Sequence, residues 1–465
     1  MSRILLKGAT VITMAAGRPD AERLDILVQD NVIHEMAPDL YLENAEIVNF
    51  SDRILIPGLV NAHIHTWQAA LRTMGADWTL LQYIAKAHGG LAGKYRPEDM
   101  AIAGLGCALN QINCGTTTIG DWCHNARTPD HAEATIQGLT QSGIRAVFLH
   151  GTAHKIRETA QPAHEIDRLL RGSIAANPLL TMGMAIPGPQ YSGAEVALAD
   201  FRTARDRDLV ISMHQSGGRP GKSWEIVHRA GLISARTNIV HGNDLPDDWL
   251  RIFIDAGANF TSTPENELSQ GHGMPITGRL RDLGVNHSLG TDTDTVLSNE
   301  VLIAARVALA LQRGLDHEKS RLATGLFSPT PTITSKDALS WLTVEGARAL
   351  GLSERIGRLQ PGMQADIVAI DCRGLNLFPT HEPVAAALQA SIANIEAVMI
   401  AGRWRKRDHT LLDIDIDSVR SRLQKSADYL VEASTPRGAI GRLREKVVLR
   451  VVNRTLRKQS RTTQS

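Results

Sequence analysis

The strongest indication of the fold is the stretch Pro57-Gly58-Leu59-Val60-Asn61-Ala62-His63-Ile64-His65. It follows the apolar run Ile54-Leu55-Ile56 and ends in two histidines spaced i, i+2. Side chains two positions apart on a β-strand point to the same face, so both imidazoles can bind one metal ion. A lone His-X-His is more often a surface or core feature that binds no metal. Only other residues of the chain can distinguish such a pair from a metal site.

Short apolar or β-branched runs alternate with longer helical patterns between residues 54 and 291. This alternation is typical of parallel strands joined by right-handed helical crossovers. We predict strands at 54–61, 116–121, 144–150, 180–186, 208–214, 237–241, 258–262 and 285–291. Helices are predicted at 97–113, 131–142, 194–206 and 223–231. Eight strands separated by helices predict a (β/α)8 TIM-type barrel.

The two ends of the chain have a different pattern. Residues 3–52 and the region around 357–404 contain short alternating strands separated by turn residues. We therefore expect a small β-sandwich domain from residues 1–56 and 357–415, a catalytic barrel at 57–356, and a basic helical tail at 416–465. Residues 436–465 are basic and amphipathic. We expect them to pack on a neighbouring subunit, with a membrane surface or an anionic partner as the alternative.

The composition limits the partners and the compartment. Lysine plus arginine (50) nearly cancel aspartate plus glutamate (49), so the chain has no net field to attract nucleic acid, and we expect a small-molecule substrate. The four cysteines form no C-x-x-C pair, which favours reduced thiols. No apolar stretch approaches the roughly 18 residues of a membrane span, and the N-terminal apolar run is too short for a signal peptide. These features predict a cytoplasmic protein.

Polar, chemically active residues stand where the predicted strands end. In a TIM-type barrel, the carboxyl ends of the strands meet at one face, which carries the active site. Histidines scattered at random would not end so many of the strands. The residues at these positions are His63, His65, Asp121, His150, His214, His241 and Asp292.

Four motifs, in order along the chain, resemble those of the amidohydrolase superfamily. They are the stretch from Pro57 to His65, then Met213-His214, Val240-His241-Gly242 and Leu289-Gly290-Thr291-Asp292. Within the superfamily, the chain is most similar to the group of cytosine deaminases, guanine deaminases and chlorotriazine hydrolases (ATZ/TRZ-like). The resemblance extends from the N-terminal β segment through Gly402. It implies a barrel hydrolase that acts on carbon–nitrogen bonds other than peptide bonds.

The resemblance also implies the roles of particular residues. His63, His65, His214 and Asp292 would bind one divalent metal ion, zinc rather than iron, with a water completing the site. Such a metal lowers the pKa of its water from about 15.7 to about 7. The catalytic residues would be Asp292, as general base and proton shuttle, and His241, beside the water and substrate. Residues 179–190 contain no lysine, so the carbamylated lysine of binuclear relatives is missing and one metal is expected.

The chain departs from the group's pattern at one position. Deaminases of the group place a glutamate three residues after the strand 5 histidine, and this chain has Gly217 there. Removing a positioned acid or base costs roughly 10²- to 10⁴-fold in rate. A conventional purine or pyrimidine deaminase is therefore disfavoured unless another residue, such as Glu265, supplies the acid; Thr263-Pro264-Glu265 is also a common helix start.

Candidate substrate contacts follow the strand ends. They are Trp67, Gln68, Gln190, Tyr191, Gln215 and Glu265. Trp67, with Trp78 and Trp122, could form an aromatic wall for a planar ligand, although loop tryptophans often only pack.

We conclude from the sequence that the chain is a metal-dependent hydrolase of a non-peptide C–N bond in a small, cyclic or heteroaromatic molecule. The alternative is a deaminase or dehalogenase of a nitrogen heterocycle that uses a substitute acid. An alternative of another class is a non-catalytic binding or scaffold barrel, but such a protein is expected to have lost metal ligands, and none is missing here. We further expect a homo-oligomer, most simply a dimer.

Overall fold

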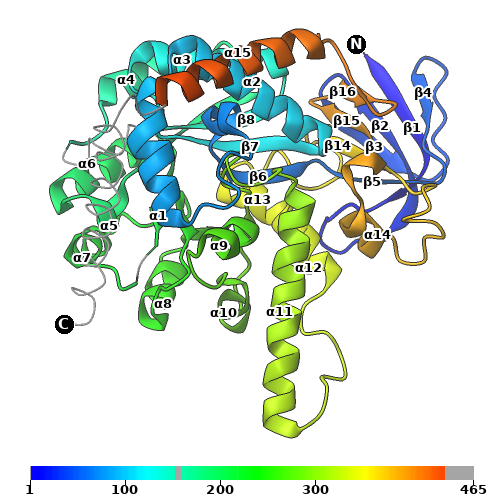
Figure 1. The fold of residues 1–465 in the computed structure, drawn as a ribbon. Coiled ribbons are helices and arrows are strands. Elements are labelled where there is room, and N and C mark those ends of the chain that lie inside the picture. The colour runs from blue at the N-terminus through cyan, green and yellow to red at the C-terminus, as the bar shows by residue number, and fades with distance from the viewer. Residues whose placement is uncertain (1, 152–158, 217, 435–465) are drawn as a thin grey trace.

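The computed structural model describes residues 2–151, 159–216 and 218–434, and two separate sheets organise it (Figure 1). The first sheet has eight parallel strands, each beside its neighbour in the sequence, with helices around them. Its strands are β6 Leu59–Ile64, β7 Thr116–Cys123, β8 Arg145–His150, β9 Leu180–Ile186, β10 Val210–Gln215, β11 Thr237–His241, β12 Asn259–Ser262 and β13 Ser288–Leu289. The predicted (β/α)8 barrel is therefore confirmed, although the last strand is shorter than the predicted 285–291.

The barrel closes where the segment after β13 meets β6. The amide groups of Thr291 and Asp292 donate to the carbonyl oxygen of His63, at 3.1 and 3.0 Å. The amide of His65 donates in turn to the carbonyl oxygen of Asp292 at 2.8 Å. Gly290 permits this approach, because a Cβ there would lie only 2.5 Å from the His63 carbonyl oxygen. The backbone that closes the barrel thus also carries three of the predicted metal ligands.

The helices between the strands start and stop where the sequence indicates. α2 (Pro97–Asn113) has proline at its first position, where a backbone N–H would have no partner within the helix. Its first turn also carries two acidic residues, which suit the positive end of the helix dipole. α3 (Pro129–Ser142) ends at Gly143, whose φ of 71° is the left-handed conformation that glycine adopts most easily. The helices predicted at 97–113, 131–142, 194–206 and 223–231 are confirmed within two residues as α2, α3, α6 and α7.

The remaining helices have the following bounds. The α-helices are α1 Leu80–Tyr83, α4 Ala163–Leu169, α5 Gly188–Tyr191, α6 Ala194–Arg205, α7 Lys222–Arg229, α8 Asp247–Asp255, α9 Pro264–Gln270, α10 Thr277–Asp282, α11 Val301–Thr324, α12 Ser335–Trp341, α13 Val344–Ala349, α14 Pro383–Gln389 and α15 Ile416–Ser434. The 3-10 and π segments are η1 Thr66–Leu71, η2 Ile84–Leu91, η3 Ala92–Lys94, η4 Leu170–Ile174 and η5 Ile392–Asn394.

The second sheet is built from both ends of the chain. Its nine strands are β1 Arg3–Val11, β2 Glu22–Gln29, β3 Val32–Ala37, β4 Glu46–Asn49, β5 Arg53–Pro57, β14 Ile367–Asp371, β15 Ile395–Ile400, β16 Arg403–Arg407 and β17 Thr410–Leu411. The antiparallel pair of β5 with β14 joins the N-terminal and C-terminal parts. This sheet has its own apolar core, centred on β1, β2 and β14, and forms the smaller lobe at the right of Figure 1.

The strand predicted at 54–61 is wrong in one respect, because the chain forms two strands there. β5 belongs to the second sheet, and β6 begins the barrel two residues later. The break falls at Gly58, where a Cβ would lie 2.0 Å from Thr117 Oγ1. Only glycine lets the chain pass this close to β7 as it leaves one sheet for the other. The domain boundaries predicted above stay a prediction.

A buried ion pair ties the two sheets together. The guanidinium of Arg145, at the start of β8, donates to both carboxylate oxygens of Asp366 just before β14, at 2.8 and 2.9 Å. Both side chains are almost completely buried. Asp366 also accepts the amide of Ala401 at 2.7 Å, which fixes it to the loop after β15. A fork-shaped contact of this kind sets the orientation of both partners.

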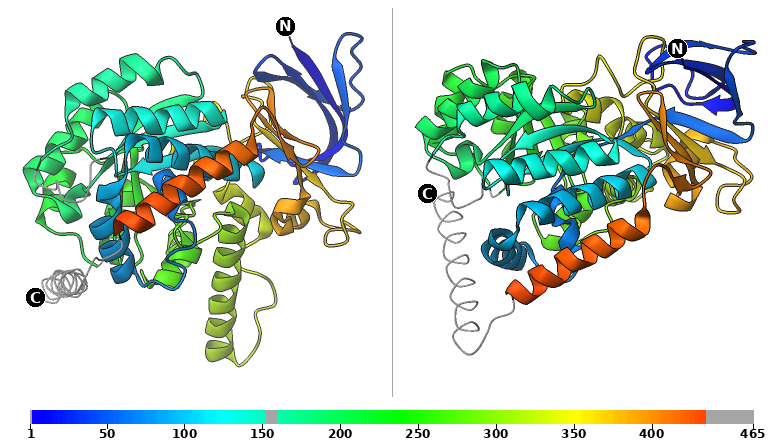
Figure 2. Two further views of the ribbon diagram at one scale, coloured as in Figure 1. Left: turned by 45° about the horizontal axis from the view of Figure 1, so that its top comes forward. Right: turned by 90° about the horizontal axis from the view of Figure 1, so that it is seen from above.

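The C-terminal helix α15 lies along α2 on the outside of the barrel (Figure 2). Ser426 of α15 donates to Asp99 of α2 at 2.8 Å, and Arg96 lies over the ring of Tyr429 at 3.7 Å. The predicted basic amphipathic segment at 436–465 lies outside the described residues.

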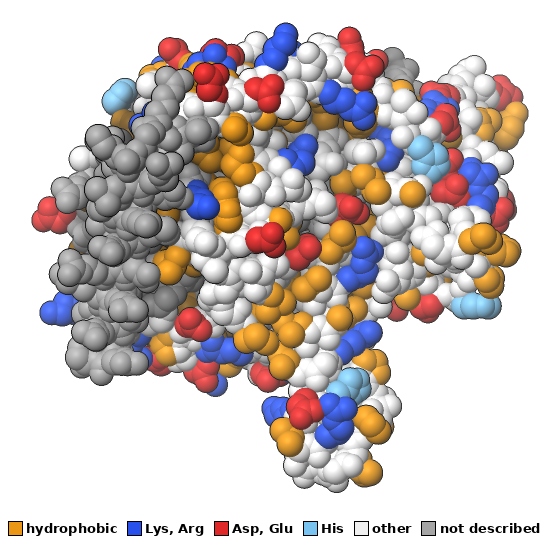
Figure 3. Space-filling view, viewed as in Figure 1, with side chains coloured by type: hydrophobic (Ala, Val, Ile, Leu, Met, Phe, Trp, Pro, Cys, Tyr) orange, Lys and Arg blue, Asp and Glu red, His pale blue; other side chains and the backbone are white. Residues whose placement is uncertain are grey.

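Three further sequence features have structural counterparts. The four cysteines are buried and free, and burial raises the pKa of each thiol. Within the described ranges, no helix has the length and apolar character needed to cross a membrane. Charged side chains of both signs are mixed over the face shown in Figure 3.

Candidate active site

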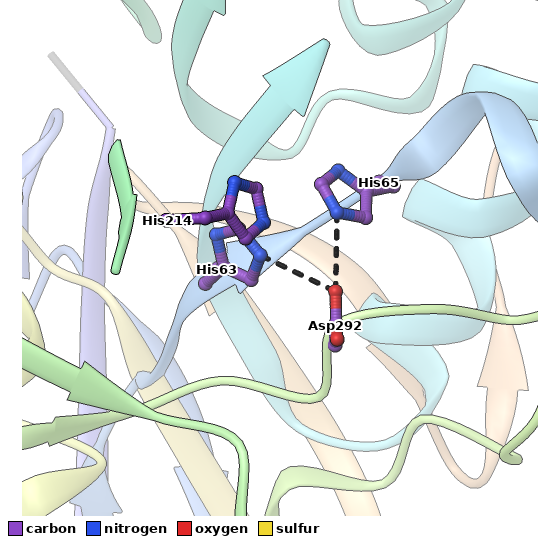
Figure 4. A group of neighbouring side chains, drawn as sticks. All are labelled: His63, His65, His214 and Asp292. Atoms are coloured by element: carbon purple, nitrogen blue, oxygen red, sulfur yellow. Dashed lines mark ion pairs between the residues drawn. The ribbon is translucent and has the colours of Figure 1, made fainter. Parts of the chain in front are cut away.

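Four of the predicted residues converge at the carboxyl ends of the barrel strands (Figure 4). His63 lies in β6, His65 directly follows it, His214 lies in β10, and Asp292 follows β13. One ligand atom from each lies within 4.8 Å of all the others. Elsewhere in the part of the chain that the structure describes, no other group of three or more such side chains converges in this way.

Asp292 is the centre of this group. Its Oδ1 lies 3.3 Å from His63 Nε2 and 3.1 Å from His65 Nε2. The other ring nitrogen of His65 lies 2.7 Å from the carbonyl oxygen of Trp122, which can only accept a hydrogen bond. His65 therefore carries its proton on Nδ1, and the lone pair of Nε2 faces Asp292.

The charges of the group suit a cation. Burial lowers the pKa of His63 to about 4, and burial together with His63 and His241 lowers that of His214 well below its ordinary value. Burial alone would raise the pKa of Asp292, but the nearby His63 and His65 hold it well below its usual range. Neutral imidazoles around one carboxylate are the protonation states that a bound metal requires.

The donor set fits a divalent metal ion. Neither ring nitrogen of the fully buried His63 makes a well-formed hydrogen bond within the described part of the chain. Leaving buried polar atoms without partners is costly, so such atoms call for a ligand. Three imidazoles and one carboxylate are ligands that zinc and ferrous iron accept. These residues would therefore hold one metal ion.

His241, at the end of β11, lies on the other side of Asp292. Its Nε2 is 4.0 Å from Asp292 Oδ2, and its Nδ1 is 3.2 Å from Glu267 Oε1. Burial alone would lower the pKa of His241, but the hydrogen bond with Glu267 and the charge of Asp292 raise it above its ordinary value. The arrangement places an imidazole beside the carboxylate that is predicted to move a proton.

The backbone at these two residues is unusual. His241 has a φ of 70° and Asp292 a φ of 67°, both in the left-handed region that residues with a side chain rarely adopt. Such conformations cost on the order of 1–3 kcal/mol each and tend to occur at functional sites. His241 is the last residue of β11, and Asp292 comes three residues after the end of β13.

Two other strand-end residues do not join the group. His150 Nδ1 lies 2.8 Å from Gln161 Oε1, and burial lowers the pKa of His150. Asp121 accepts the amide of Thr66 at 3.2 Å, and burial raises its pKa to about 6. His150 and Asp121 are therefore not among the converging ligand atoms.

The predicted contacts after β6 are buried and already have partners. Trp67 donates from Nε1 to His124 at 3.2 Å and packs against Tyr95. Gln68 donates to the hydroxyl of Tyr83 at 2.6 Å and accepts from Thr295 at 3.1 Å. Their role as substrate contacts stays a prediction.

The predicted contacts near β9 and β10 differ in how well they are satisfied. Gln190 has a buried Oε1 with no hydrogen-bond partner in the described chain, and the same holds for Nε2 of Gln215. Gln215 accepts Trp224 Nε1 at 2.8 Å, and the Tyr191 hydroxyl donates to the carbonyl of Ser216 at 2.9 Å. Gln190 and Gln215 therefore have polar atoms available for a ligand.

Helix α9 brings Asn266 and Glu267 to Asp292 and His241, and not the predicted Glu265. Glu265 is half-buried, and its charged neighbours are Glu300 and Arg306; burial and Glu300 raise its pKa. Asn266 and Glu267, both fully buried, instead face Asp292 and His241. A helix places residues two apart on nearly opposite faces, so the packing of α9 that brings Glu267 to His241 turns Glu265 away, and the sequence alone does not show which of the two faces the site. Gly217 lies outside the described residues.

Three further histidines lie near the site and were not among the predicted site residues. The ring of His272 lies 4.5 Å from that of His241, and burial lowers its pKa to about 4. The ring of His124 lies 4.2 Å from that of His65, and His124 Nε2 lies 3.2 Å from His88 Nε2. No spacing signal identifies them, because they come from three separate parts of the chain: η2 for His88, the loop after β7 for His124 and the loop after α9 for His272.

Sequence comparisons show what the chain is similar to. Residues 54–405 match the sequence model of the amidohydrolase family. A 5-methylthioadenosine/S-adenosylhomocysteine deaminase from Caldicellulosiruptor saccharolyticus is 24% identical over 449 residues, which cover 93% of this chain and 99% of that protein. A 5'-deoxyadenosine deaminase from Methanosarcina barkeri is 24% identical over 447 residues, with the same coverage of 93% and 99%.

Solved structures show a similar fold. An adenosine deaminase from Xanthomonas campestris with bound zinc has a TM-score of 0.79 at 21% identity, covering 93% of this chain and 99% of that one. An atrazine chlorohydrolase from Arthrobacter aurescens TC1 complexed with zinc has a TM-score of 0.78 at 20% identity, covering 91% and 100%. At these identities the likeness establishes the fold alone.

Proposed function

We propose, from the premise that this chain belongs to the amidohydrolase family, that it uses one divalent metal ion to hydrolyse a C–N bond of a small nitrogen heterocycle. The predicted resemblance to this family, and the prediction of a hydrolase, are confirmed by the family match over residues 54–405. The substrate, the metal and the roles of the individual residues are our proposals.

The observation that carries the proposal is the convergence of His63, His65, His214 and Asp292 at the barrel's carboxyl end. A scaffold barrel without catalysis has no need to keep three imidazoles and an anionic carboxylate buried together. Burying such a set without a cation is unfavourable. The intact donor set therefore argues for the enzyme and against the non-catalytic alternative.

The residues divide the chemistry between them. A divalent metal, zinc in our proposal, would supply Lewis acidity that makes water a nucleophile at neutral pH. Asp292 directs Oδ1 toward the two histidines, while Oδ2 is free of them and lies 4.0 Å from His241 Nε2. We assign to Asp292 Oδ2 the acceptance of the proton from the attacking water. In our proposal, His241 lies next to Asp292 Oδ2, which accepts this proton, and next to the substrate.

The surroundings favour an uncharged, planar substrate. Trp122 contacts His214 edge-on at 4.4 Å between ring centroids, and it has a buried Nε1 without a hydrogen-bond partner in the described residues. With Gln190 and Gln215, this gives neutral donors and acceptors at the ends of β7, β9 and β10. Several curated relatives are named as deaminases of adenine-containing compounds, which supports an aminated heteroaromatic ring as the substrate.

Other properties remain proposals of the same kind. We propose a small-molecule substrate only, with no nucleic-acid partner, since the charges of the chain nearly cancel. A cytoplasmic location and a homodimer follow from the sequence expectations.

A substrate panel tests the function. Metal-replete protein is assayed with aminated heterocycles, chlorinated heterocycles, cyclic amides and N-acyl compounds, and release of ammonia, release of chloride and ring opening are scored separately. We expect ammonia release from at least one aminated heterocycle. Chloride release alone would favour the dehalogenase alternative. No turnover of any compound by protein with a full metal complement would contradict the proposed hydrolase.

A further inference from the structure

The side chain of Glu267 is held in one position from three directions. It is fully buried on α9, directly after β12. Its Oε1 accepts the amide of Thr263 at 2.8 Å and lies 3.2 Å from His241 Nδ1. Its Oε2 accepts the hydroxyl of Ser262 at 2.9 Å. A buried carboxylate held by this many partners has one orientation.

This contact decides which nitrogen of His241 faces the reaction. A carboxylate can only accept hydrogen bonds, so His241 donates from Nδ1–H to Glu267. In the neutral ring, Nε2 then has the lone pair, and this is the nitrogen that lies 4.0 Å from Asp292 Oδ2. The carboxylate of Glu267 thus fixes both the ring plane and the tautomer of His241, as carboxylates commonly do for histidines in active sites.

The residue next to Glu267 makes the matching contact on Asp292. The side-chain amide of Asn266 donates to Asp292 Oδ2. His63 and His65 face the other carboxylate oxygen, Oδ1. Two consecutive residues of one short helix therefore reach the two groups to which we assign the proton. No other helix among the described residues is bonded to both.

We propose that Glu267 is a positioning residue that orients His241 through its Nδ1, with Asn266 doing the same for Asp292. Glu267 does not touch the substrate. This proposal rests on the proposed function. It adds which residues orient the two side chains that handle the proton, in a chain that has glycine at 217.

Variants at Glu267 test the proposal. Glu267→Ala removes the acceptor, whereas Glu267→Gln can keep an amide oxygen in the place of Oε1, toward both the Thr263 amide and His241 Nδ1, and is expected to retain the tautomer. We expect Glu267→Ala to lower kcat by about 10²- to 10³-fold with KM within about threefold. The matched control is Glu345→Gln, a buried glutamate bonded to Asn286 before β13, at the opposite end of the barrel. We expect its kcat to be unchanged.

A second readout needs no substrate. In protein labelled with ¹⁵N-histidine, the signals of His241 are identified by their absence in His241→Gln. We expect the wild type and Glu267→Gln to show a protonated Nδ1 and an unprotonated Nε2, and Glu267→Ala to shift this balance, while metal content stays at the wild-type level.

The two readouts separate failure of this proposal from failure of the proposed function. An unchanged His241 tautomer in Glu267→Ala, or a kcat within threefold of the wild type in that variant, would overturn the positioning role. Absence of turnover in the wild type would contradict the proposed function alone, because the tautomer shift would still support the role of Glu267. If Glu267→Ala does not fold, Glu267→Met, which keeps the volume but removes the acceptor, decides in its place.

Discussion

Gly290→Ala tests whether barrel closure sets the geometry of the metal ligands. Gly290 lies between β13 and Asp292, against the backbone of His63. A methyl group there would stand 2.5 Å from the His63 carbonyl oxygen, 2.8 Å from its Cβ and 2.9 Å from its nitrogen. All three are atoms that cannot rotate away from the methyl group.

The size of the effect follows from these distances. Ordinary contact begins near 3.4 Å, so the two backbones must separate by about 0.9 Å. The hydrogen bonds from Thr291 and Asp292 to His63, now 3.1 and 3.0 Å, would lengthen beyond a useful range. Metal sites tolerate about 0.2 Å in ligand distance, and a misplacement of about 1 Å can cost about 10²-fold in rate. We expect zinc affinity to fall at least tenfold and kcat/KM about 100-fold.

The assay combines zinc titration of the metal-free protein with turnover and thermal unfolding. Overpacking of this kind is expected to destabilise the fold by about 1–3 kcal/mol, so binding is measured well below the unfolding temperature. The control is Gly314→Ala in α11, where a Cβ meets nothing within 4 Å. It should raise the stability of the helix by up to about 1 kcal/mol and leave zinc affinity unchanged.

Wild-type zinc affinity together with turnover within twofold in Gly290→Ala would refute this reasoning. It would mean that His63, His65 and Asp292 keep their mutual positions without the close contact of β6 and the segment after β13.

The remaining predictions concern the proton acceptor, the contact between the sheets and a buried carboxyl. Asp292→Asn should lower kcat about 10²- to 10⁴-fold, and an unchanged rate in steady-state assays would exclude the proton shuttle. Arg145→Met should destabilise the protein by about 3–5 kcal/mol in thermal unfolding because it leaves Asp366 buried without its partner; adding Asp366→Asn should recover part of the loss. Burial raises the pKa of Asp200 to about 7, so the folded state holds the extra proton and stability should fall as pH rises from about 4 to 7. Asp200→Asn should remove up to about 4 kcal/mol of that pH dependence, and a wild-type slope in the variant would contradict the assignment to Asp200.

Local patterns predicted the barrel well because each of its parts has a local signature. The helix starting at Pro97 has a proline and acidic residues at its first turn, and the strands are short apolar runs. The convergence of the four proposed metal ligands could also be predicted, because a strand end is a local feature and the topology of a barrel brings strand ends together.

The parts that were missed depend on tertiary contacts. The Pro57-Gly58 pair interrupts the apolar run, but nothing local indicates that the chain changes sheet there; at Gly58, β7 leaves no room for a side chain. Glu265 and Glu267 are equally plausible in sequence, since only the packing of α9 decides which face of the helix meets β11. His124 and His272 reach the site from separate loops, so no spacing rule connects them to His63.

The most direct test of the central claim is the metal content of the folded chain. Protein incubated with excess zinc and then desalted is measured by inductively coupled plasma mass spectrometry, with His214→Ala as the comparison. The convergence of His63, His65, His214 and Asp292 predicts one zinc per chain in the wild type and much less in the variant. No retained metal in the wild type, or an equal amount in His214→Ala, would contradict the assignment of this group as the metal centre.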